Sequence, residues 1–250
     1  MGDVMRLKGK TAVVTGGASG FGAGIARKFA TEGAQVIVAD QNLDGALSIA
    51  TEIGGIAQLC NVSDLDSVLA MKDAALTAFG HLDILVNNAG TTHLPLALED
   101  VTAADFEKVY NVNIKSVYLT AQAFVPHFKE RGCGAILNVA STGGVSPRPR
   151  LTWYNASKGW MITATKGMAV ELAPSGIRVN AINPVAGETP LLKSFMGEDT
   201  PEIRAKFLST IPIGRFSTPE DMGNAACFLC SDEASMITGV AMEVDGGRCI

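Results

Sequence analysis

The sequence predicts an α/β fold in which helices cover both faces of a doubly wound parallel sheet of about seven strands. Three observations support this prediction. Short apolar runs alternate with longer amphipathic runs along all 250 residues. Most of the short runs are apolar almost throughout, as expected for parallel strands that are buried on both faces. No repeat, low-complexity segment or linker interrupts the pattern, so we expect residues 1–250 to form a single domain.

The individual elements follow from this alternation. Strands are expected at residues 11–15, 35–39, 56–60, 82–86, 135–139, 177–182 and 240–244. Helices are expected near residues 22–32, 43–53, 64–79, 103–130, 153–173 and 219–231. The last helix has a recognisable start, because Thr218 is followed by a proline and two acidic residues. A Gly- and Pro-rich segment near residues 188–216 precedes it, and we expect this segment to form a small mobile lid over the substrate.

Composition excludes several classes of protein. Twenty Lys and Arg against 25 Asp and Glu give a net charge of -5, which offers no basic surface for nucleic acid. No apolar run approaches the roughly 18 residues that span a membrane, and the first residues lack the apolar core of a signal peptide. We therefore expect a soluble cytoplasmic protein with no nucleic-acid or membrane partner.

Cysteine and histidine usage predicts no metal site. Cys227 and Cys230 form a C-x-x-C pair inside an apolar, helix-like run, which favours buried, inert thiols over a redox motif. No second cysteine pair completes a zinc site, and the three histidines lack metal-ligand spacing.

A glycine-rich turn follows the first predicted strand and opens the first predicted helix. Gly16, Gly20 and Gly22 permit a tight turn and let backbone N–H groups approach a pyrophosphate at the helix N-terminus. Ser19 and Phe21 lie between these glycines and are expected to contact the same ligand. Because the turn stands between a strand and an amphipathic helix, it indicates a dinucleotide cofactor.

The end of the second strand predicts which dinucleotide binds. Asp40 lies 18 residues beyond Gly22, where a carboxylate accepts both hydroxyls of an adenosine ribose and repels a 2′-phosphate. Neither Ser19 nor Gln41 is basic, so no cation is evident for that phosphate. The predicted cofactor is NAD rather than NADP. The alternative is that Asp40 only caps a helix that begins near Asn42.

An acid–base group is expected on the helix near 153–173. Tyr154 and Lys158 are four residues apart and therefore share one helix face. A phenol has a reference pKa of about 10, and a nearby ammonium favours its ionised form. Ser141 follows the fifth strand, where its hydroxyl can polarise a substrate oxygen. Alone, the Tyr–Lys spacing is also typical of a surface pair.

Taken together, these motifs resemble the short-chain dehydrogenase/reductases, a family with a Rossmann-like fold, over essentially the whole chain. The family's glycine turn matches Thr15 to Gly22, and its Asn-Asn-Ala-Gly element matches Asn87 to Gly90. Its catalytic Asn, Ser, Tyr and Lys match Asn113, Ser141, Tyr154 and Lys158, and its C-terminal Asp-Gly-Gly matches Asp245 to Gly247.

The resemblance implies a role for each residue of this tetrad. Tyr154 is the implied general acid/base, and Lys158 is implied to lower its pKa and to bind the nicotinamide ribose. Ser141 is implied to orient the reacting oxygen, and Asn113 to hold a water that links Lys158 to solvent. Further cofactor contacts are implied at Asn88, Ala89 and Gly90.

Two positions depart from the family pattern. Asn61-Val62 stands where the family usually has Asp-Val, and an Asn carbonyl can still accept a bond from the adenine amino group. Pro184-Val185 replaces Pro-Gly, which crowds the backbone near the nicotinamide, although Gly187 is expected to restore room. Thr189 is implied to lie near the cofactor phosphates and amide.

Substrate contacts are expected in the loop that precedes Tyr154. Arg148 and Arg150 are notable in a chain with few charges, and guanidinium groups suit carboxylate, phosphate or sulfonate oxygens. Trp153 is a further candidate for the pocket wall. The alternative is a solvated loop or a subunit contact.

The predicted function is an oxidoreductase that transfers a hydride between NAD(H) and a secondary alcohol or ketone. The substrate is expected to be a small polyol, a sugar or a cyclic alcohol, with an anionic group as an open question. An NADPH-dependent 3-oxoacyl-carrier-protein reductase shares these motifs, but Asp40 argues against NADPH. A nucleotide-sensing protein without chemistry would lack part of the acid–base set. The resemblance also implies a homotetramer.

Overall fold

The computed structural model describes residues 5–250, and within them a seven-stranded, fully parallel sheet confirms the predicted fold class. The strand order is β3-β2-β1-β4-β5-β6-β7, so the direction of winding reverses between β1 and β4. In such sheets the ligand crevice lies outside the carboxyl ends of the strands at that reversal. The strands are β1 (Thr11–Thr15), β2 (Gln35–Asp40), β3 (Ile56–Leu59), β4 (Ile84–Asn87), β5 (Gly134–Val139), β6 (Ile177–Pro184) and β7 (Ala241–Val244).

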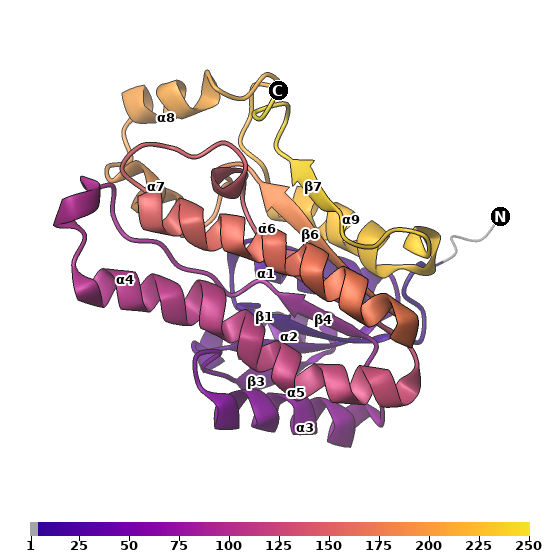
Figure 1. Ribbon diagram of the computed structural model, residues 1–250. Helices are drawn as coiled ribbons and strands as arrows, with labels where there is room; N and C mark the ends of the chain where they lie inside the picture. Colours follow the sequence, from indigo (N-terminus) through magenta and orange to yellow (C-terminus); the bar gives the residue numbers. More distant parts are fainter. Residues whose placement is uncertain (1–4) are drawn as a thin grey trace.

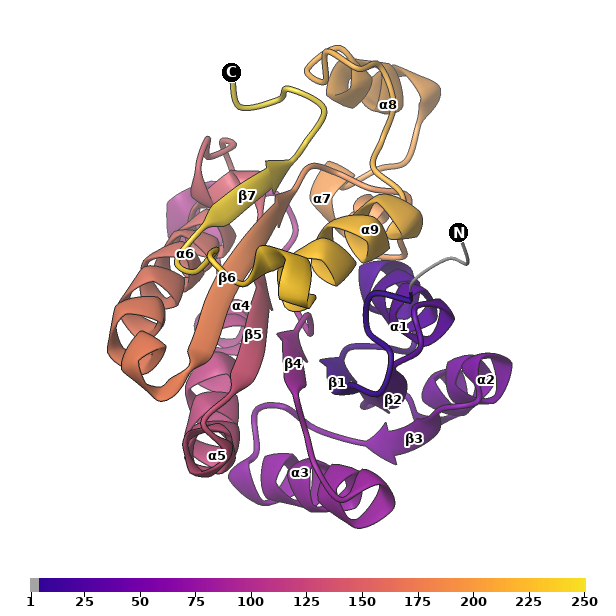
Figure 2. The same ribbon diagram turned by 90° about the vertical axis from the view of Figure 1, so that its right-hand side faces the viewer.

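Helices cover both faces of this sheet, as Figures 1 and 2 show. One face carries α1 (Gly20–Thr31), α2 (Leu43–Ile53) and α9 (Pro219–Cys230). The other carries α3 (Leu65–Phe79), α5 (Ser116–Arg131) and α6 (Thr152–Leu172). Strand residues alternate between the two cores: Val14 packs against the first set of helices, whereas Val13 packs against the second. Burial on both faces explains why the strands are apolar almost throughout.

The helix expected near 103–130 is present and runs without a break to Arg131, but it is not regular throughout. Instead α4 (Ala103–Tyr110) passes into a π turn at Asn111–Lys115 and then into α5. The wider turn contains Asn113, which is completely buried and bonded to the backbone of Thr91. Single π turns of this kind concentrate at functional sites.

The segment near 188–216 contains two short helices, α7 (Leu192–Met196) and α8 (Pro201–Leu208). They pack on a small separate core that includes Val185, Ile211 and Phe216. In Figure 1 this segment lies at the same end of the molecule as the C-terminus. Among residues 5–250, no helix combines the length and the apolar character that membrane crossing requires.

Candidate active site

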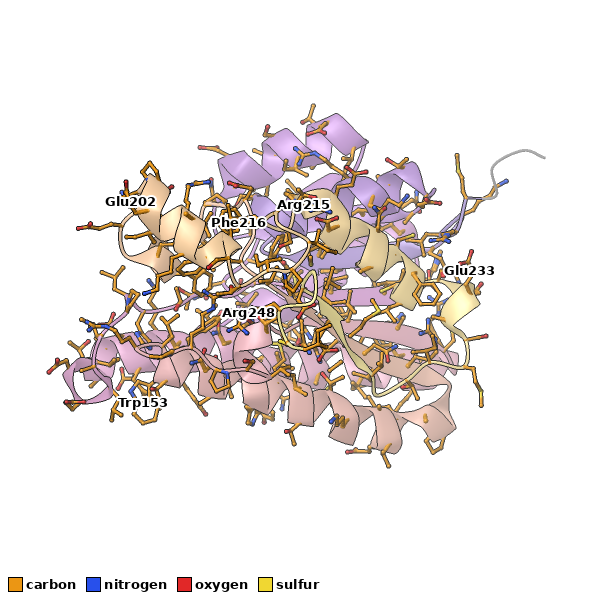
Figure 3. The ribbon with its side chains drawn as sticks, turned by 90° about the horizontal axis from the view of Figure 1, so that it is seen from above. Trp153, Glu202, Arg215, Phe216, Glu233 and Arg248 are labelled. Atoms are coloured by element: carbon orange, nitrogen blue, oxygen red, sulfur yellow. The ribbon has the colours of Figure 1, made fainter. Side chains whose placement is uncertain are left out.

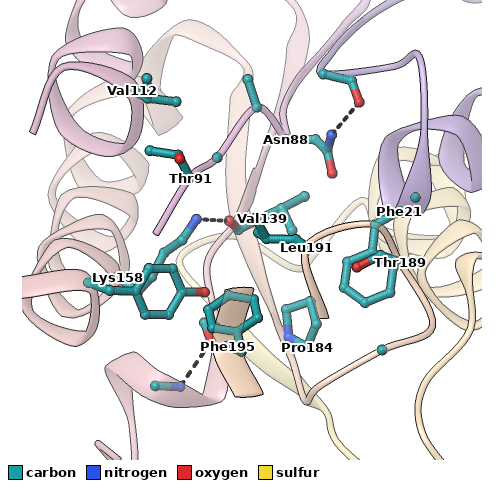
Figure 4. Close-up of a pocket in the computed structure, with 18 of the residues that line it drawn as sticks. Phe21, Asn88, Thr91, Val112, Val139, Lys158, Pro184, Thr189, Leu191 and Phe195 are labelled. Atoms are coloured by element: carbon teal, nitrogen blue, oxygen red, sulfur yellow. Dashed lines mark hydrogen bonds between the residues drawn. The ribbon is translucent and has the colours of Figure 1, made fainter. Parts of the chain in front are cut away.

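A cavity of about 590 Å³ opens at the carboxyl ends of the central strands. This volume lies within the range of typical small-molecule sites. Figure 4 shows its wall, with the first turn of α1 on one side and α6 on the other. Most of the predicted cofactor residues line it, namely Gly16, Ser19, Gly20, Phe21, Asp40, Asn61, Val62, Asn88, Ala89, Gly90, Tyr154, Lys158, Pro184, Gly187 and Thr189.

The glycine turn has the close packing that a phosphate cradle needs. Gly16 has φ +63° and Gly20 φ +54°, conformations that favour glycine. Gly22 lies just behind the cavity wall, and a Cβ there would collide with the Gly16 carbonyl and the Asn88 amide. The Asn88 amide holds the turn in place by donating to the Gly16 carbonyl at 3.0 Å and to the Thr15 carbonyl at 2.8 Å.

The N-terminus of α1 is available to an anion. Ser19 occupies the N-cap position, but its side chain makes no capping hydrogen bond. The first N–H groups of a helix lack intrahelical partners, and the helix dipole favours a negative charge beside them. The turn and the helix start therefore fit a pyrophosphate.

Asp40 presents a fixed carboxylate at the far end of this cavity. One oxygen accepts from the Ala18 N–H at 3.1 Å, and the other accepts from the Asn42 N–H at 2.9 Å. Asn42, not Asp40, caps α2, because its side chain accepts from Gly45 N. Gln41, which follows Asp40 in the sequence, lines the cavity, and so does Asn61. Neither side chain carries a positive charge.

The acid–base residues meet where β5 approaches α6. The Lys158 side chain is only 4% exposed, and its Nζ donates to the Val139 carbonyl at 2.8 Å (Figure 4). Its Nζ lies 6.0 Å from the centre of the Tyr154 ring. Ser141 Oγ accepts from the Gly143 N–H at 3.0 Å, and its hydroxyl acts on the Tyr154 phenol, so both hydroxyls face the same point of the cavity.

Burial is the largest influence on the pKa values of Tyr154 and Lys158. It raises the pKa of Tyr154 to about 12, although the Ser141 hydroxyl and the charge of Arg148 act in the opposite direction. Burial also lowers the pKa of Lys158 to about 8. Lys158 is not among the groups that shift the Tyr154 pKa in the cofactor-free protein, so the lowering that the resemblance implied stays a prediction.

Asn113 lies behind the cavity rather than in its wall. Its Oδ1 accepts from the Thr91 N–H, and its Nδ2 donates to the Thr91 carbonyl and to Ser157 Oγ, all at 2.9–3.0 Å. Ser157 Oγ in turn donates to the Tyr154 carbonyl at 2.7 Å. The amide thus ties the loop after β4 to the helix that carries the tyrosine.

Of the three predicted substrate residues, only Arg148 lines the cavity. Arg148 lines the cavity, and its guanidinium lies 4.2 Å from the centre of the Phe207 ring. Arg150 is exposed and its guanidinium donates to the Pro95 carbonyl, outside the cavity. Trp153 packs edge-on against Phe106 and also lies outside, at the rim of the molecule in Figure 3.

Several cavity residues were not predicted from the sequence. Phe207 comes from α8 and Leu191 from the loop before α7, so both depend on a segment without a clear periodic signal. Phe195 on α7 packs edge-on against Tyr154, with 5.0 Å between ring centres, and it is labelled among the cavity residues in Figure 4. The sequence does suggest Phe195 as a candidate for the pocket wall, in an apolar stretch at 191–196 that could close over the site, but a packed aromatic is the more common role of such a residue.

Comparison with known proteins agrees with this geometry. A family model described as enoyl-(acyl carrier protein) reductase matches residues 16–248. The 4-formylbenzenesulfonate dehydrogenase of Comamonas testosteroni is 53% identical over 98% of this chain and 100% of its own. The 7alpha-hydroxysteroid dehydrogenase of Escherichia coli is 39% identical over 98% of this chain and 96% of its own.

Solved structures show the same likeness. The crystal structure of a 3-ketoacyl-(acyl-carrier-protein) reductase from Brucella melitensis, complexed with NADH, is 51% identical, with a TM-score of 0.93 over 98% of this chain and 100% of that chain. A 7 alpha-hydroxysteroid dehydrogenase complexed with NADH and 7-oxo glycochenodeoxycholic acid is 38% identical, with a TM-score of 0.92 over 99% and 97%. The chain belongs to the short-chain dehydrogenase/reductase family and is an oxidoreductase that acts on CH–OH groups with a nicotinamide cofactor.

Proposed function

We propose that this protein is an NAD(H)-dependent oxidoreductase that interconverts an alcohol and a carbonyl compound on a ring-containing substrate. The observation that carries the proposal is the placement of Ser141, Tyr154 and Lys158 in the cavity that also holds the glycine turn and Asp40. An enzyme needs the acid–base residues and the cofactor-binding residues in one cleft, whereas a nucleotide sensor needs only the cofactor-binding residues. The complete acid–base set therefore favours catalysis.

The protein's part in the reaction is positioning and proton transfer. When bound, the nicotinamide cofactor supplies or accepts the hydride. When substrate is bound, Ser141 donates its hydroxyl proton to the reacting oxygen and holds that oxygen beside the phenol of Tyr154. With its raised pKa, Tyr154 is protonated at neutral pH and acts as the general acid of carbonyl reduction. A cationic nicotinamide favours the phenolate, which is the base that oxidation requires.

The preference for NAD rests on Asp40. Its carboxylate is fixed by two backbone N–H groups, and a charged acceptor there binds ribose hydroxyls but repels a 2′-phosphate. Because a hydrogen bond to a charged group contributes about 1.5–3 kcal/mol, we expect Asp40→Ser to weaken NAD binding by about 10–100-fold and to improve NADP binding. Asp44→Ser, in the exposed first turn of α2, is the matched control. Titration of both variants with both cofactors tests this assignment, and an unchanged preference in Asp40→Ser contradicts it.

The cavity wall favours a ring over a polyol or a sugar. Leu151, Phe195 and Phe207 line the part of the cavity near Tyr154, and such side chains contact flat apolar groups well. The similarity to a 4-formylbenzenesulfonate dehydrogenase supports the same choice. We therefore place a cyclic or aromatic alcohol ahead of the small polyols and sugars. A screen of aromatic and aliphatic alcohols with NAD tests this order, and a higher kcat/KM for polyols reverses it.

A second candidate is a 3-oxoacyl-carrier-protein reductase. The NADH complex of a 51% identical protein with that name favours it, because it joins this activity to the cofactor that Asp40 predicts. Reduction of a 3-oxoacyl thioester with NADH distinguishes the two. Turnover of the thioester with a higher kcat/KM than any aromatic substrate selects the second candidate.

We also propose that the protein is a homotetramer and that residues 188–216 close over the substrate. Exposed aromatic side chains on α4, α5 and α6, namely Phe106, Tyr110, Tyr118 and Trp160, support the first proposal. The residues that α7 and α8 contribute to the cavity support the second. Light scattering that gives the mass of a monomer contradicts the tetramer.

We keep the proposals of a cytoplasmic location and of no nucleic-acid, membrane or metal partner.

A further inference from the structure

Arg148 has a side chain without a polar partner. Its Nη2 is buried and unbonded, and among residues 5–250 it is the one arginine whose guanidinium makes neither a hydrogen bond nor a salt bridge within the protein. A buried donor left unsatisfied costs about 1–3 kcal/mol, and more when the group is charged. The Arg148 guanidinium therefore sits in the cavity wall at a cost that a ligand can offset.

A second arginine with a buried, unpartnered nitrogen lies near it. Nε of Arg248 is buried without a partner, and its remaining contact is a long bond from Nη1 to Ser146 Oγ at 3.3 Å. Arg248 belongs to the segment after β7, which Asp245 holds in place by accepting from Gly247 N and Cys249 N at 2.9 and 2.8 Å. Figure 3 shows Arg248 over the middle of the molecule, in contrast to Trp153 at its rim.

The two guanidinium groups share one electrostatic environment. Burial and then the charge of Arg248 lower the pKa of Arg148, to about 10. Asp245, the nearest acidic residue in the sequence, uses its carboxylate on backbone N–H groups instead. Two like charges that are partly buried and have no carboxylate partner form a site that is complementary to an anion.

The surroundings indicate what kind of anion fits. Arg148 lines the same cavity as Tyr154, and its positive charge lowers the pKa of that phenol, so the two groups lie within electrostatic reach. Phe207 covers the guanidinium of Arg148 with its ring face. An aromatic ring seated on this wall can place its reacting group at Tyr154 and a charged group at Arg148.

We propose that Arg148 and Arg248 together bind an oxyanion, a carboxylate or a sulfonate, at the end of the substrate opposite its reacting carbonyl. The proposal rests on the proposed function and adds to it the substrate class and a residue outside the predicted site, Arg248. It also restricts the earlier prediction, since Arg150 has no part in this site. Planar oxyanions and sulfonates match the paired N–H donors of guanidinium groups.

Reduction kinetics with NADH test the site on three matched aldehydes. These are 4-formylbenzenesulfonate, para-formylbenzoate and the neutral para-formylbenzamide. We expect Arg148→Gln and Arg248→Gln each to raise KM for the two anions by about 10–100-fold, with KM for the amide changed less than about threefold. Arg150→Gln is the matched control and should leave all three KM values unchanged. Equal changes for charged and neutral aldehydes overturn the proposal.

Direct binding separates this proposal from the proposed function. Calorimetric titration of the NADH complex with benzenesulfonate and with benzoate requires no turnover, so it remains informative if no aldehyde is reduced. We expect binding that is lost in Arg148→Gln and partly kept in Arg148→Lys, which also guards against a folding defect. Binding of one anion and not the other identifies the group that the site selects. The site is refuted if both anions bind Arg148→Gln as tightly as they bind wild type, or if neither anion binds wild type.

Discussion

Replacing Lys158 with methionine should make the protein more stable while it removes activity. Lys158 is buried, and its pKa falls from 10.5 to about 8. Below pH 8 the folded protein therefore keeps a buried charge that lowers its free energy of unfolding. This difference in pKa corresponds to about 3.4 kcal/mol. Between pH 8 and 10.5 the unfolded chain binds the extra proton, so wild-type stability rises with pH and the destabilisation is gone above 10.5.

Methionine removes this titration but also leaves the Val139 carbonyl without its donor. That loss, about 1–3 kcal/mol, does not depend on pH. The pH dependence therefore isolates the charge: we expect the stability gap between Lys158→Met and wild type to shrink by about 2 kcal/mol from pH 7 to pH 9.5.

Urea unfolding of the cofactor-free protein at both pH values measures this gap. Lys166→Met is the matched control, because Lys166 is exposed on the same helix. Its stability should follow that of wild type at both pH values. A gap between Lys158→Met and wild type that stays constant with pH would refute the assigned burial cost.

Two further predictions concern the cofactor turn and the lid. Gly22→Ala should weaken NADH binding by about 100-fold, because the new Cβ collides with the Gly16 carbonyl, whereas Gly167→Ala, where a Cβ meets no atom within 4 Å, should not. Fluorescence titration with NADH compares the two, and equal affinities contradict the close packing of the turn. Phe195→Ala should raise KM for an aromatic substrate by about 10-fold through the loss of its contact with Tyr154, whereas Phe106→Ala, which disrupts an edge-on pair outside the cavity, should leave KM unchanged. Equal KM values for these two variants exclude a role of α7 in substrate binding.

Strands and most helices could be predicted because each has a local signal. Apolar runs mark the buried strands, and Thr218 with its proline and acids marks the start of α9, where a capping box forms. The predicted boundaries all lie within two residues of the observed ones, and the start of β4 at Ile84 rather than Leu82 is one of the largest differences. Strand order could not be predicted in this way, because it depends on contacts between distant segments.

The π turn at Asn113 escaped prediction for a related reason. One extra residue in a helical turn barely changes the pattern of apolar residues, so 103–130 resembles one helix. Its cause is tertiary, since the Asn113 amide is bonded to Thr91 and Ser157.

The functional site also combines residues that the sequence predicts with residues that it does not. Residues in contiguous motifs, such as Gly16 and Tyr154, were predicted and lie in the cavity wall. Arg148 and Arg150 are equivalent in the sequence, but Arg150 has φ +67° and the turn there directs its side chain to Pro95. Arg248 has no sequence signal, because only the return of the C-terminal segment to Ser146 brings it near Arg148.

Tyr154 is proposed to transfer the proton while the surrounding cleft binds NADH. Tyr154→Phe removes one oxygen atom from a residue that is 6% exposed and leaves the ring contact with Phe195 in place. The most direct measurement is the rate of NADH oxidation with 4-formylbenzenesulfonate by wild type and by Tyr154→Phe, beside the NADH dissociation constant of each. We predict that kcat falls by about 10²–10⁴-fold while NADH affinity changes less than about threefold. A Tyr154→Phe enzyme with kcat within a few-fold of an active wild type contradicts the account.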